Sequence, residues 1–567
     1  MNHREKLVSL LILTILCTSL MIGTFTYRLP QKSKTNVAET HSSTTSLQQE
    51  PNEAETPSST PRDYSRDRKH LLHRYPNKHH PWMEEADSYL ACMKDRAQLT
   101  TEQATNDRYP IEPMTNSASY WVEAGTNGDG TSETTPAGNI TYILNNYALT
   151  DETIHVKAGI YDDAIETFPL NFTVYANITL ESTDGPASTV IQGTYTFSGI
   201  KITTHENTIN GFTISNFVTG IELTNTSGNT ISGNTITNNF DGIYSSLECN
   251  NNTISGNNIT ANTASYGINL DSGRNHTITR NTITNNPYGI YLSGSNHTIT
   301  GNTITNNEDY GIYLHGASNN TITGNTITDN NFDGILLRDS SNTTIAANTI
   351  THNTYRGIRL DSASNTTISD NTITGHGAAS IRLDFSNHSV ITGNTLTHNR
   401  KGLFVTSSSR NNIILGNTIA NHTHNAIELS FVSDNVITGN TIANITTYDG
   451  VNLKWANNTT ISDNTITNNR HGIQIYIDSY NNTITGNIIA NNTYNGISLS
   501  SNGTTIAGNI ITNNNDYGIG ISASSHANNI TGNTITNNHG GMYMYASIEN
   551  TITYNTITDN ANEGISL

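Results

Sequence analysis

Two aspartates 23 residues apart could do acid–base chemistry. Asp361 and Asp384 each end a copy of the segment Ile-Arg-Leu-Asp. If the chain stacks these two segments on each other, their carboxylates lie about 5 Å apart. Carboxylates held that close can share a proton and serve as acid and base in glycan chemistry. The alternative is that Arg338, Arg359 and Arg382 neutralise the pair in a surface ladder of opposite charges.

Aromatic and basic side chains gather around the same positions and could bind a sugar. Aromatic rings stack on sugar rings, and arginine holds carboxylates or sulfates in a planar fork. Seven of the 13 basic residues in the part of the chain from 109 onward lie between Arg338 and Arg410. The predicted ligand-binding residues are Tyr291, Tyr313, His315, Arg338, Arg359, Arg382 and Phe404. An ionic ladder, a glycan-binding strip and a catalytic pair all remain open for this set.

A repeat must position these side chains. The phrase NTITGNTITNN, a variable tip and the step Gly-Ile-x-Leu recur from near Asn207 to the last residues of the sequence. The isoleucine position of that step occurs sixteen times between Ile221 and Ile565, which is 344 residues in 15 intervals and a mean near 23. A regular period in this range indicates a solenoid.

The residues within one period predict which solenoid. Each period contains three short segments centred on isoleucine, two of the type Thr-Ile-Thr and one Gly-Ile-x-Leu. Threonine and isoleucine favour strands, and alternation places isoleucine on one face only. The first and third residues after the isoleucine of Gly-Ile-x-Leu should then face outward in two columns, which contain the predicted ligand-binding residues. No segment is long enough for a helix. We therefore expect an all-β parallel β-helix with three sheets, in which each strand pairs with its equivalent about 4.8 Å along the axis.

Asparagine is abundant because a sharp corner needs it. Asparagine tolerates the left-handed conformation, and stacked amides can bond to one another along the axis. The corner pairs include Asn238-Asn239, Asn285-Asn286, Asn306-Asn307 and Asn537-Asn538, and the residues that replace asparagine there are Asp329, His352, His398 and His422. We interpret most of these residues as structural.

The repeat, together with the segments YWVEAGTNGDGTSETTP and DETIHVKAGIYDD, resembles the right-handed parallel β-helix proteins of the pectin lyase-like superfamily. The resemblance covers residues 118–567. It is strongest to the asparagine-rich repeats of NosD-like copper-maturation proteins and of carbohydrate-binding and sugar-hydrolase proteins. The resemblance implies that Ile140–Leu149 forms a short helix that caps the first sheet edge.

Two motifs that could carry chemistry in such families do not carry over. Gly375-His376-Gly377 is similar to the Gly-His-Gly of polygalacturonases, but the Asn-Thr-Asp, Asp-Asp and Arg-Ile-Lys motifs that accompany it there are missing. His352 and His398 lie two turns apart, about 10 Å, which is too far to share a copper ion. We therefore predict no metal and no cofactor.

The first 117 residues differ from the rest in composition. Residues 1–27 hold an uncharged apolar run, Leu7–Phe25, after Arg4 and Lys6, which predicts a signal peptide or a signal anchor in the membrane. Residues 28–63 predict a disordered linker, and 64–117 a polar, basic segment with a possible short helix. The β-helix is expected to follow as an opening and cap module at 118–206 and repeats at 207–567.

Charge and location narrow the function. Residues 109–567 carry 13 basic and 33 acidic residues, so nucleic acid is not an expected partner. We expect an exported, surface-displayed or membrane-anchored protein with a non-catalytic face for surface or matrix carbohydrate. A polysaccharide lyase, hydrolase or epimerase is one alternative, and a structural envelope stalk that self-associates through an uncapped C-terminal end is another. Sequons at the repeat tips are glycosylation acceptors in an exported chain, for example Asn275, Asn296, Asn319, Asn365 and Asn481.

Overall fold

The computed structural model describes residues 119–567, apart from residues 148, 477 and 523. The segments predicted for 1–27, 28–63 and 64–117 therefore lie outside the described residues. Within the described part, no helix is both long enough and apolar enough to cross a membrane. The division between an opening module and repeats near residue 206 stays a prediction.

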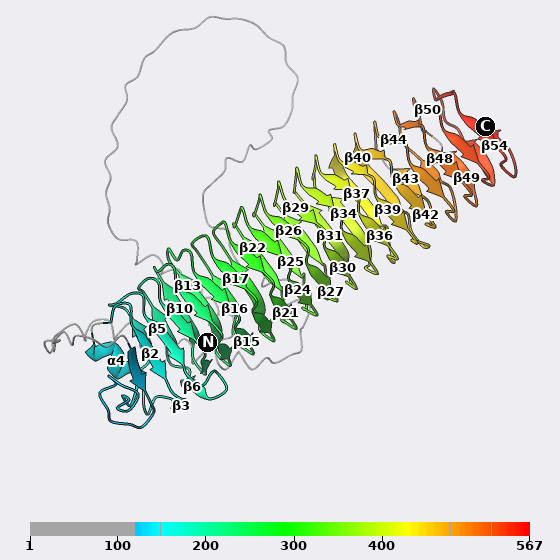
Figure 1. Ribbon diagram of the computed structural model, residues 1–567. Helices are drawn as coiled ribbons and strands as arrows, with labels where there is room; N and C mark the ends of the chain where they lie inside the picture. The colour runs from blue at the N-terminus through cyan, green and yellow to red at the C-terminus, as the bar shows by residue number, and fades with distance from the viewer. Residues whose placement is uncertain (1–118, 148, 477, 523) are drawn as a thin grey trace, which may run out of the picture. The chain divides into compact units, whose positions relative to one another are not determined.

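The described chain winds as a right-handed parallel β-helix of about 18 turns (Figure 1). It has three parallel sheets: sheet A has 19 strands, and sheets B and C have 18 each. Sheet A begins with β1 (Ser119–Val122), sheet B with β3 (Gly159–Tyr161) and sheet C with β4 (Leu170–Phe172). The predicted all-β fold, with three sheets and about 23 residues per turn, is confirmed.

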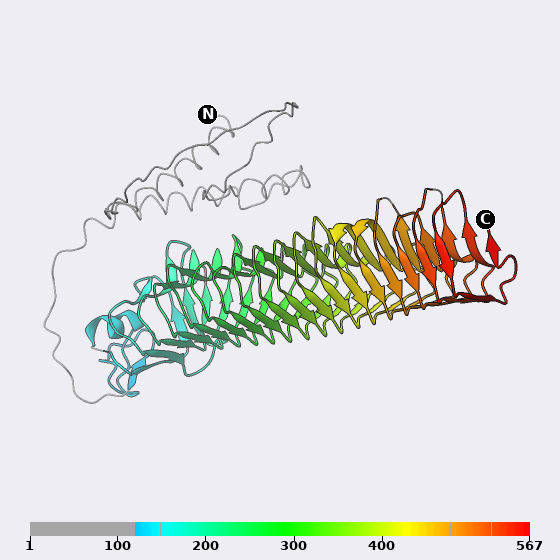
Figure 2. The same ribbon diagram turned by 90° about the horizontal axis from the view of Figure 1, so that it is seen from above.

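One turn shows how the sequence makes the fold. β26 (Thr344–Ala346) lies in sheet A, β27 (Thr349–Thr351) in sheet B and β28 (Ile358–Asp361) in sheet C. Each strand places one isoleucine inside, and Ile345, Ile350 and Ile358 are fully buried. Successive turns stack on one another along the solenoid (Figure 2). The same isoleucine column continues in the neighbouring turns, so the interior is a continuous apolar stack.

Buried asparagines hold the corners between turns. The Oδ1 atom of Asn348 accepts from the backbone N–H of Asn325 at 2.9 Å, and its Nδ2 donates to Asn371 Oδ1 and to the carbonyl of Ile322, both at 2.9 Å. The amide therefore satisfies backbone groups that the corner leaves without a sheet partner. The predicted amide ladder is confirmed at the Asn-Asn corner, where Asn307 Nδ2 donates to Asn330 Oδ1 at 2.9 Å. The ladder of Asn348 belongs to the other corner, at the Gly-Asn-Thr position of the repeat, which was not predicted.

The two asparagines of each corner pair do different things. The first has a left-handed backbone, as in Asn238 with φ 54° and Asn306 with φ 55°, while the second is buried in the ladder. Asp329, His352 and His398 take the first place, with φ of 55°, 52° and 56°. The sequence alone did not distinguish the first place of the corner pair from the second. His422 takes the second, buried place, and so does His376.

Two further histidines replace asparagine in a buried ladder. His276 and His297 are stacked, with ring centroids 5.2 Å apart and an angle of 3° between the planes. His276 Nδ1 accepts from the backbone N–H of Asn252, and His297 Nδ1 from that of His276, both at 3.3 Å. Burial lowers the pKa of each imidazole to about 4, and for His276 the neighbouring His297 adds to the effect.

The expected helix near the first turns is present but shorter than predicted. α4 (Ile140–Asn146) begins after Asn139, whose side chain accepts from the N–H of Tyr142. Glu166 accepts from the N–H groups of Ile140 at 2.6 Å and of Thr141 at 2.9 Å. Ile143 packs into the core, so the helix is fixed at the N-terminal end of the solenoid (Figure 1).

The last described turn is more exposed than the turns before it. Its strands are β53 (Thr551–Thr553), β54 (Thr556–Thr558) and β55 (Ile565–Ser566). Their inward isoleucines Ile552 and Ile557 are only partly buried, and Ile565 is 45% exposed. Self-association through this end stays a prediction.

Removing a ladder amide should destabilise the solenoid. Asn348→Ala leaves the N–H of Asn325 and the carbonyl of Ile322 without a partner, so we expect a lower thermal unfolding midpoint, equivalent to about 2 kcal/mol. Circular dichroism during heating measures the midpoint. Asn296→Gly is the control, because Asn296 is exposed with φ 64° and glycine adopts that conformation freely. An equal loss in both variants would refute the role of the ladder.

The buried histidine pair should make stability depend on pH. Since the folded pKa is about 4 against an ordinary value of 6.5, the unfolded chain binds more protons between these values. Stability should therefore be full above pH 6.5 and fall as the pH drops from 6.5 toward 4. In the double variant His276→Asn/His297→Asn, which restores the common ladder residue, thermal melts across that range should show a shallower fall. An unchanged slope would contradict this origin.

Candidate functional site

The outer face of sheet C carries the residues singled out from the sequence. Its relevant strands are β16 (Tyr266–Leu270), β19 (Tyr288–Leu292), β22 (Ile312–His315), β25 (Ile335–Arg338), β28 (Ile358–Asp361), β31 (Ala379–Asp384), β34 (Lys401–Thr406), β37 (Ile427–Ser433), β40 (Val451–Asn457) and β43 (Ile473–Tyr476). They are parallel neighbours in this order.

The register forms the two columns that the repeat predicts. One column contains Tyr291, Tyr313, Leu336, Arg359, Arg382 and Phe404. The other contains His315, Arg338, Asp361 and Asp384. Tyr291 and Asp384 are more enclosed than simple alternation predicts, with exposed fractions of 7% and 3%, because neighbouring side chains of the same face cover them.

An arginine lies between the two aspartates. Arg359 donates from Nη2 to Asp361 Oδ2 at 3.0 Å and from Nε to Asp384 Oδ2 at 3.2 Å. Arg382 grips Asp384 with two bonds of 2.8 Å, from Nε and from Nη2. Arg338 Nε lies 3.5 Å from Asp361 Oδ2. This arrangement matches the ionic ladder, since each carboxylate faces a guanidinium.

The electrostatics of Arg359 follow from this position. Burial opposes its charge and is the largest single influence, but the carboxylates of Asp361 and Asp384 together outweigh it and raise the pKa of the guanidinium. A guanidinium held by two anions gives an external carboxylate or sulfate little to bind. The basic strip is therefore largely neutralised from within the protein.

The ionic network continues into the next turns, at residues that were not predicted to belong to the site. Glu428, 4% exposed, accepts from Lys401 Nζ at 2.7 Å, from Lys454 Nζ at 3.0 Å and from Asn425 Nδ2 at 2.9 Å. Lys401 Nζ also lies 4.2 Å from the ring centroid of Phe404. These contacts lower the pKa of Glu428 although burial, the largest influence, acts to raise it.

A row of aromatic side chains flanks the predicted columns and was missed. From Tyr266 through Tyr288 to Tyr310, neighbouring ring centroids are separated by 5.0 and 5.9 Å. From Tyr310 through Phe332 to Tyr355, the separations are 4.9 and 5.0 Å. Tyr291 and Tyr313 pack against this row from the first column, at 5.3 Å from Tyr266 and 5.2 Å from Tyr310. The signal was an aromatic residue one or two places before the glycine of the Gly-Ile step.

The aromatic row ends at a buried ion pair. Arg356 lies over the ring of Tyr355, with 3.9 Å between its Cζ and the ring centroid, and its Nη1 is 3.4 Å from Asp333 Oδ2. Burial raises the pKa of Asp333 to about 6, against the opposing effect of Arg356. His315, next to Tyr313, lies 3.8 Å from Asp339, with Nε2 facing Oδ2. Along the solenoid, the outer face of sheet C thus changes from aromatic rings to paired charges.

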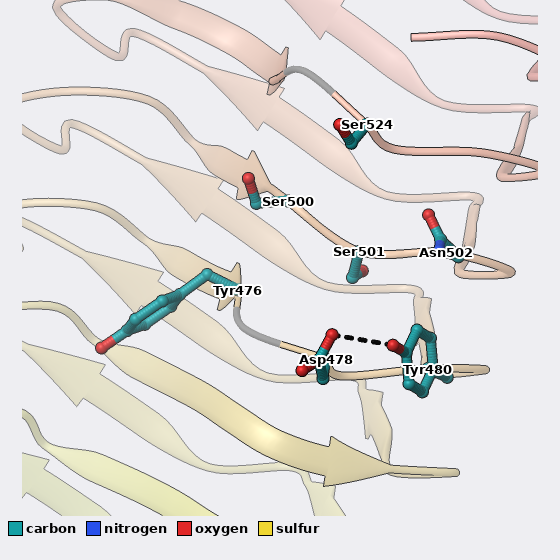
Figure 3. Close-up of a pocket in the computed structure, with 7 residues that line it drawn as sticks. All are labelled: Tyr476, Asp478, Tyr480, Ser500, Ser501, Asn502 and Ser524. Atoms are coloured by element: carbon teal, nitrogen blue, oxygen red, sulfur yellow. Dashed lines mark hydrogen bonds between the residues drawn. The ribbon is translucent and has the colours of Figure 1, made fainter.

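A shallow cavity of about 330 Å³ lies farther along, where the strands of sheet C end (Figure 3). Its lining residues are Tyr476, Asp478, Tyr480, Ser500, Ser501, Asn502 and Ser524. The hydroxyl of Tyr480 donates to Asp478 Oδ1 at 2.8 Å, while the Tyr476 ring extends in the other direction (Figure 3).

The part of the chain that the structure describes contains no group of three or more His, Cys, Asp or Glu side chains that could hold a metal ion. In the stacked pair His276 and His297, each Nδ1 accepts from a backbone N–H, and His297 Nε2 lies 2.9 Å from the carbonyl of Ser293. These described residues do not fit a copper centre.

Comparison with known families agrees with the fold. The family model "Right handed beta helix region" matches residues 288–430, 381–535 and 503–567, and the model "Periplasmic copper-binding protein (NosD)" matches residues 145–333. The chain is a right-handed parallel β-helix protein of the pectin lyase-like superfamily. No curated protein sequence matches it.

Solved structures are similar in fold at low identity. The mannuronan C-5 epimerase AlgE6 A-module of Azotobacter vinelandii is 14% identical, with 71% of this chain and 90% of that one covered and a TM-score of 0.31. Tailspike protein 2 of bacteriophage CBA120 is 12% identical, with 43% of each chain covered and a TM-score of 0.36. DFA-IIIase of Arthrobacter chlorophenolicus is 11% identical, with 55% and 83% covered and a TM-score of 0.32.

The ionic ladder predicts a measurable coupling between Arg359 and Asp384. A double-mutant cycle with Arg359→Gln and Asp384→Asn should give a coupling energy of about 1–3 kcal/mol in thermal or denaturant unfolding, because either single change leaves a buried charged group short of a partner. The control cycle pairs Arg359→Gln with the distant Asp478→Asn and should give none. Additive effects in the first cycle would contradict the ladder.

Proposed function

We propose that the protein is an exported, surface-displayed β-helix whose sheet C face binds a surface or matrix carbohydrate without transforming it. The observation that carries the proposal is the row of rings from Tyr266 to Tyr355 on one face of the solenoid. Sheets A and B present mostly threonine and serine at the corresponding positions. An apolar, aromatic face of this kind is suited to the ring faces and edges of sugars.

Location supports the same proposal. The apolar run at residues 7–25 is typical of exported chains, anchored in or released from the membrane. The NosD model that matches residues 145–333 is named for a periplasmic protein. An acidic body with 13 basic and 33 acidic residues after residue 108 favours an uncharged partner over a polyanion.

Of the predicted ligand-binding residues, the aromatic ones support this function best. Tyr313 lies next to the ring of Tyr310, and Phe404 lies next to the ammonium group of Lys401. The side chain of His315 is 34% exposed. Arg338, Arg359 and Arg382 contact carboxylates of the protein, so their role in the proposal is to fix the face. Tyr291 packs between Tyr266 and Tyr313 and supports the row.

A glycan array probed with the full-length chain tests the proposal. Wild type should bind at least one glycan, and Phe332→Ala and Tyr355→Ala should each weaken that binding about tenfold, since each removes a ring from the row. Tyr494→Ala is the matched control, because Tyr494 is an exposed aromatic at the same place of a later turn, outside the row. Arg359→Ala and Arg382→Ala should change glycan binding only to the extent that they lower the stability of the protein.

Other outcomes would select the alternatives. Release of sugar products that Asp384→Asn abolishes would instead identify a polysaccharide lyase, hydrolase or epimerase that uses Asp361 and Asp384. Absence of any glycan binding, together with end-to-end association of the chain in solution, would favour the structural stalk.

A further inference from the structure

A pair of stacked aromatic rings, one exposed and one partly buried, lies at a corner that follows sheet C, separate from the row described above. Phe431 and Trp455 lie on the paired strands β37 and β40, where Ser430 pairs with Lys454 and Val432 with Ala456. Their ring centroids are 4.4 Å apart and the planes differ by 8°, so the rings are stacked in parallel. Phe431 is 55% exposed.

The backbone at this corner is left-handed, which large side chains adopt only at a cost. Phe431 has φ 58° and Trp455 has φ 48°. In most other turns the same column holds residues that suit this conformation: Gly294, Gly316, Asp339, Ser362 and Ser407, all with positive φ; Phe385, with φ 49°, is a single ring between Ser362 and Ser407. Two adjacent turns thus carry aromatic residues where the backbone favours small or polar ones.

Burial does not offset that cost for Phe431, which stays more than half exposed. Strained residues that gain little for the fold are typical of binding sites. Because the rings are stacked face to face, each covers one face of the other, and a sugar ring can pack on an outer face of the stack, which the strand pairing on both sides holds rigid. A rigid aromatic surface of this size fits one face of a sugar ring.

The following turns supply groups for sugar hydroxyls. The cavity of about 330 Å³ begins one turn on, since Tyr476 pairs with Lys454, the residue before Trp455. Asp478, Tyr480, Ser500 and Asn502 line it (Figure 3), and its lining residues include no cation. Lys454 itself is paired with Glu428 at 3.0 Å. A carboxylate without a neighbouring cation favours hydroxyl groups and disfavours uronates or sulfates.

We propose that Phe431 and Trp455 form a binding platform for a pyranose ring of a neutral glycan, with the adjoining cavity holding its hydroxyl groups. This inference deepens the proposed carbohydrate binding and rests on it for the kind of ligand. It adds a second contact area on the same molecule and names the charge class of the glycan.

Tryptophan fluorescence tests the platform directly, because Trp455 is one of only three tryptophans in the chain. The full-length chain is titrated with hexamers of neutral sugars (glucose, xylose, mannose and N-acetylglucosamine, each β-1,4-linked) and with a galacturonate hexamer. A saturable change in emission is expected with a neutral hexamer and none with galacturonate. The change should vanish in Trp455→Ser, and Phe431→Ser should weaken binding about tenfold.

Matched variants separate binding from folding. Serine is the residue found at this corner in Ser362 and Ser407, so both serine variants should keep the thermal midpoint or raise it. Phe385→Ser is the control: Phe385 is 59% exposed at the same corner place, but the turn after it carries Ser407, not a ring, and binding should not change.

The outcomes distinguish the two proposals. If glycan binding depends on Phe332 while no neutral hexamer changes Trp455 emission, the platform is refuted and the sheet C face stands. Unchanged affinity in Phe431→Ser and Trp455→Ser also refutes the platform. If no glycan binds at all, both proposals fail.

Discussion

In-register stacking of the turns is the constraint on which every other feature depends. The isoleucines of the three sheets meet in a dry interior, and their burial drives the stack. Isoleucine alone does not fix which residue faces which, because any register of the repeat buries apolar groups. The asparagine amides do fix it: each, as at Asn348, bonds to the turns on both sides and is satisfied only when the turns align.

This constraint turns a one-dimensional repeat into a two-dimensional surface. A residue that departs from the threonine and serine consensus in one turn lies one strand spacing from its counterpart in the next. The ladder of Arg359, Asp361, Arg382 and Asp384 and the row from Tyr266 to Tyr355 are both built in this way. Because sheets A and B mostly keep the consensus, the departures from it are concentrated on sheet C. The charges there are paired, so they fix the side chains of this face and leave it little net charge.

The fold and the two columns of sheet C could be predicted from the sequence, because both follow from the position of isoleucine within a period. The partners of the charges could not be predicted: Arg359 reaches Asp384 in the next turn as well as Asp361 in its own, a choice made by side-chain torsions. The aromatic row was missed because the ring directly precedes the glycine of the Gly-Ile step at Tyr310 and lies two residues before that glycine at Phe332, so no fixed column contains it. Phe431 and Trp455 were missed because a left-handed backbone at a bulky residue leaves no mark in the sequence.

The spacing between distant turns tests the stacking most directly. Spin labels at Thr300 and Thr485, the same sheet A position eight turns apart, can be attached through cysteine in a chain whose native cysteines are replaced. Electron–electron dipolar spectroscopy should give one narrow distance near 38 Å, which is eight strand spacings of about 4.8 Å. A broad distribution, or a peak displaced by more than two strand spacings (about 10 Å), would show that the turns do not stack in this register and would leave the sheet C face without a basis.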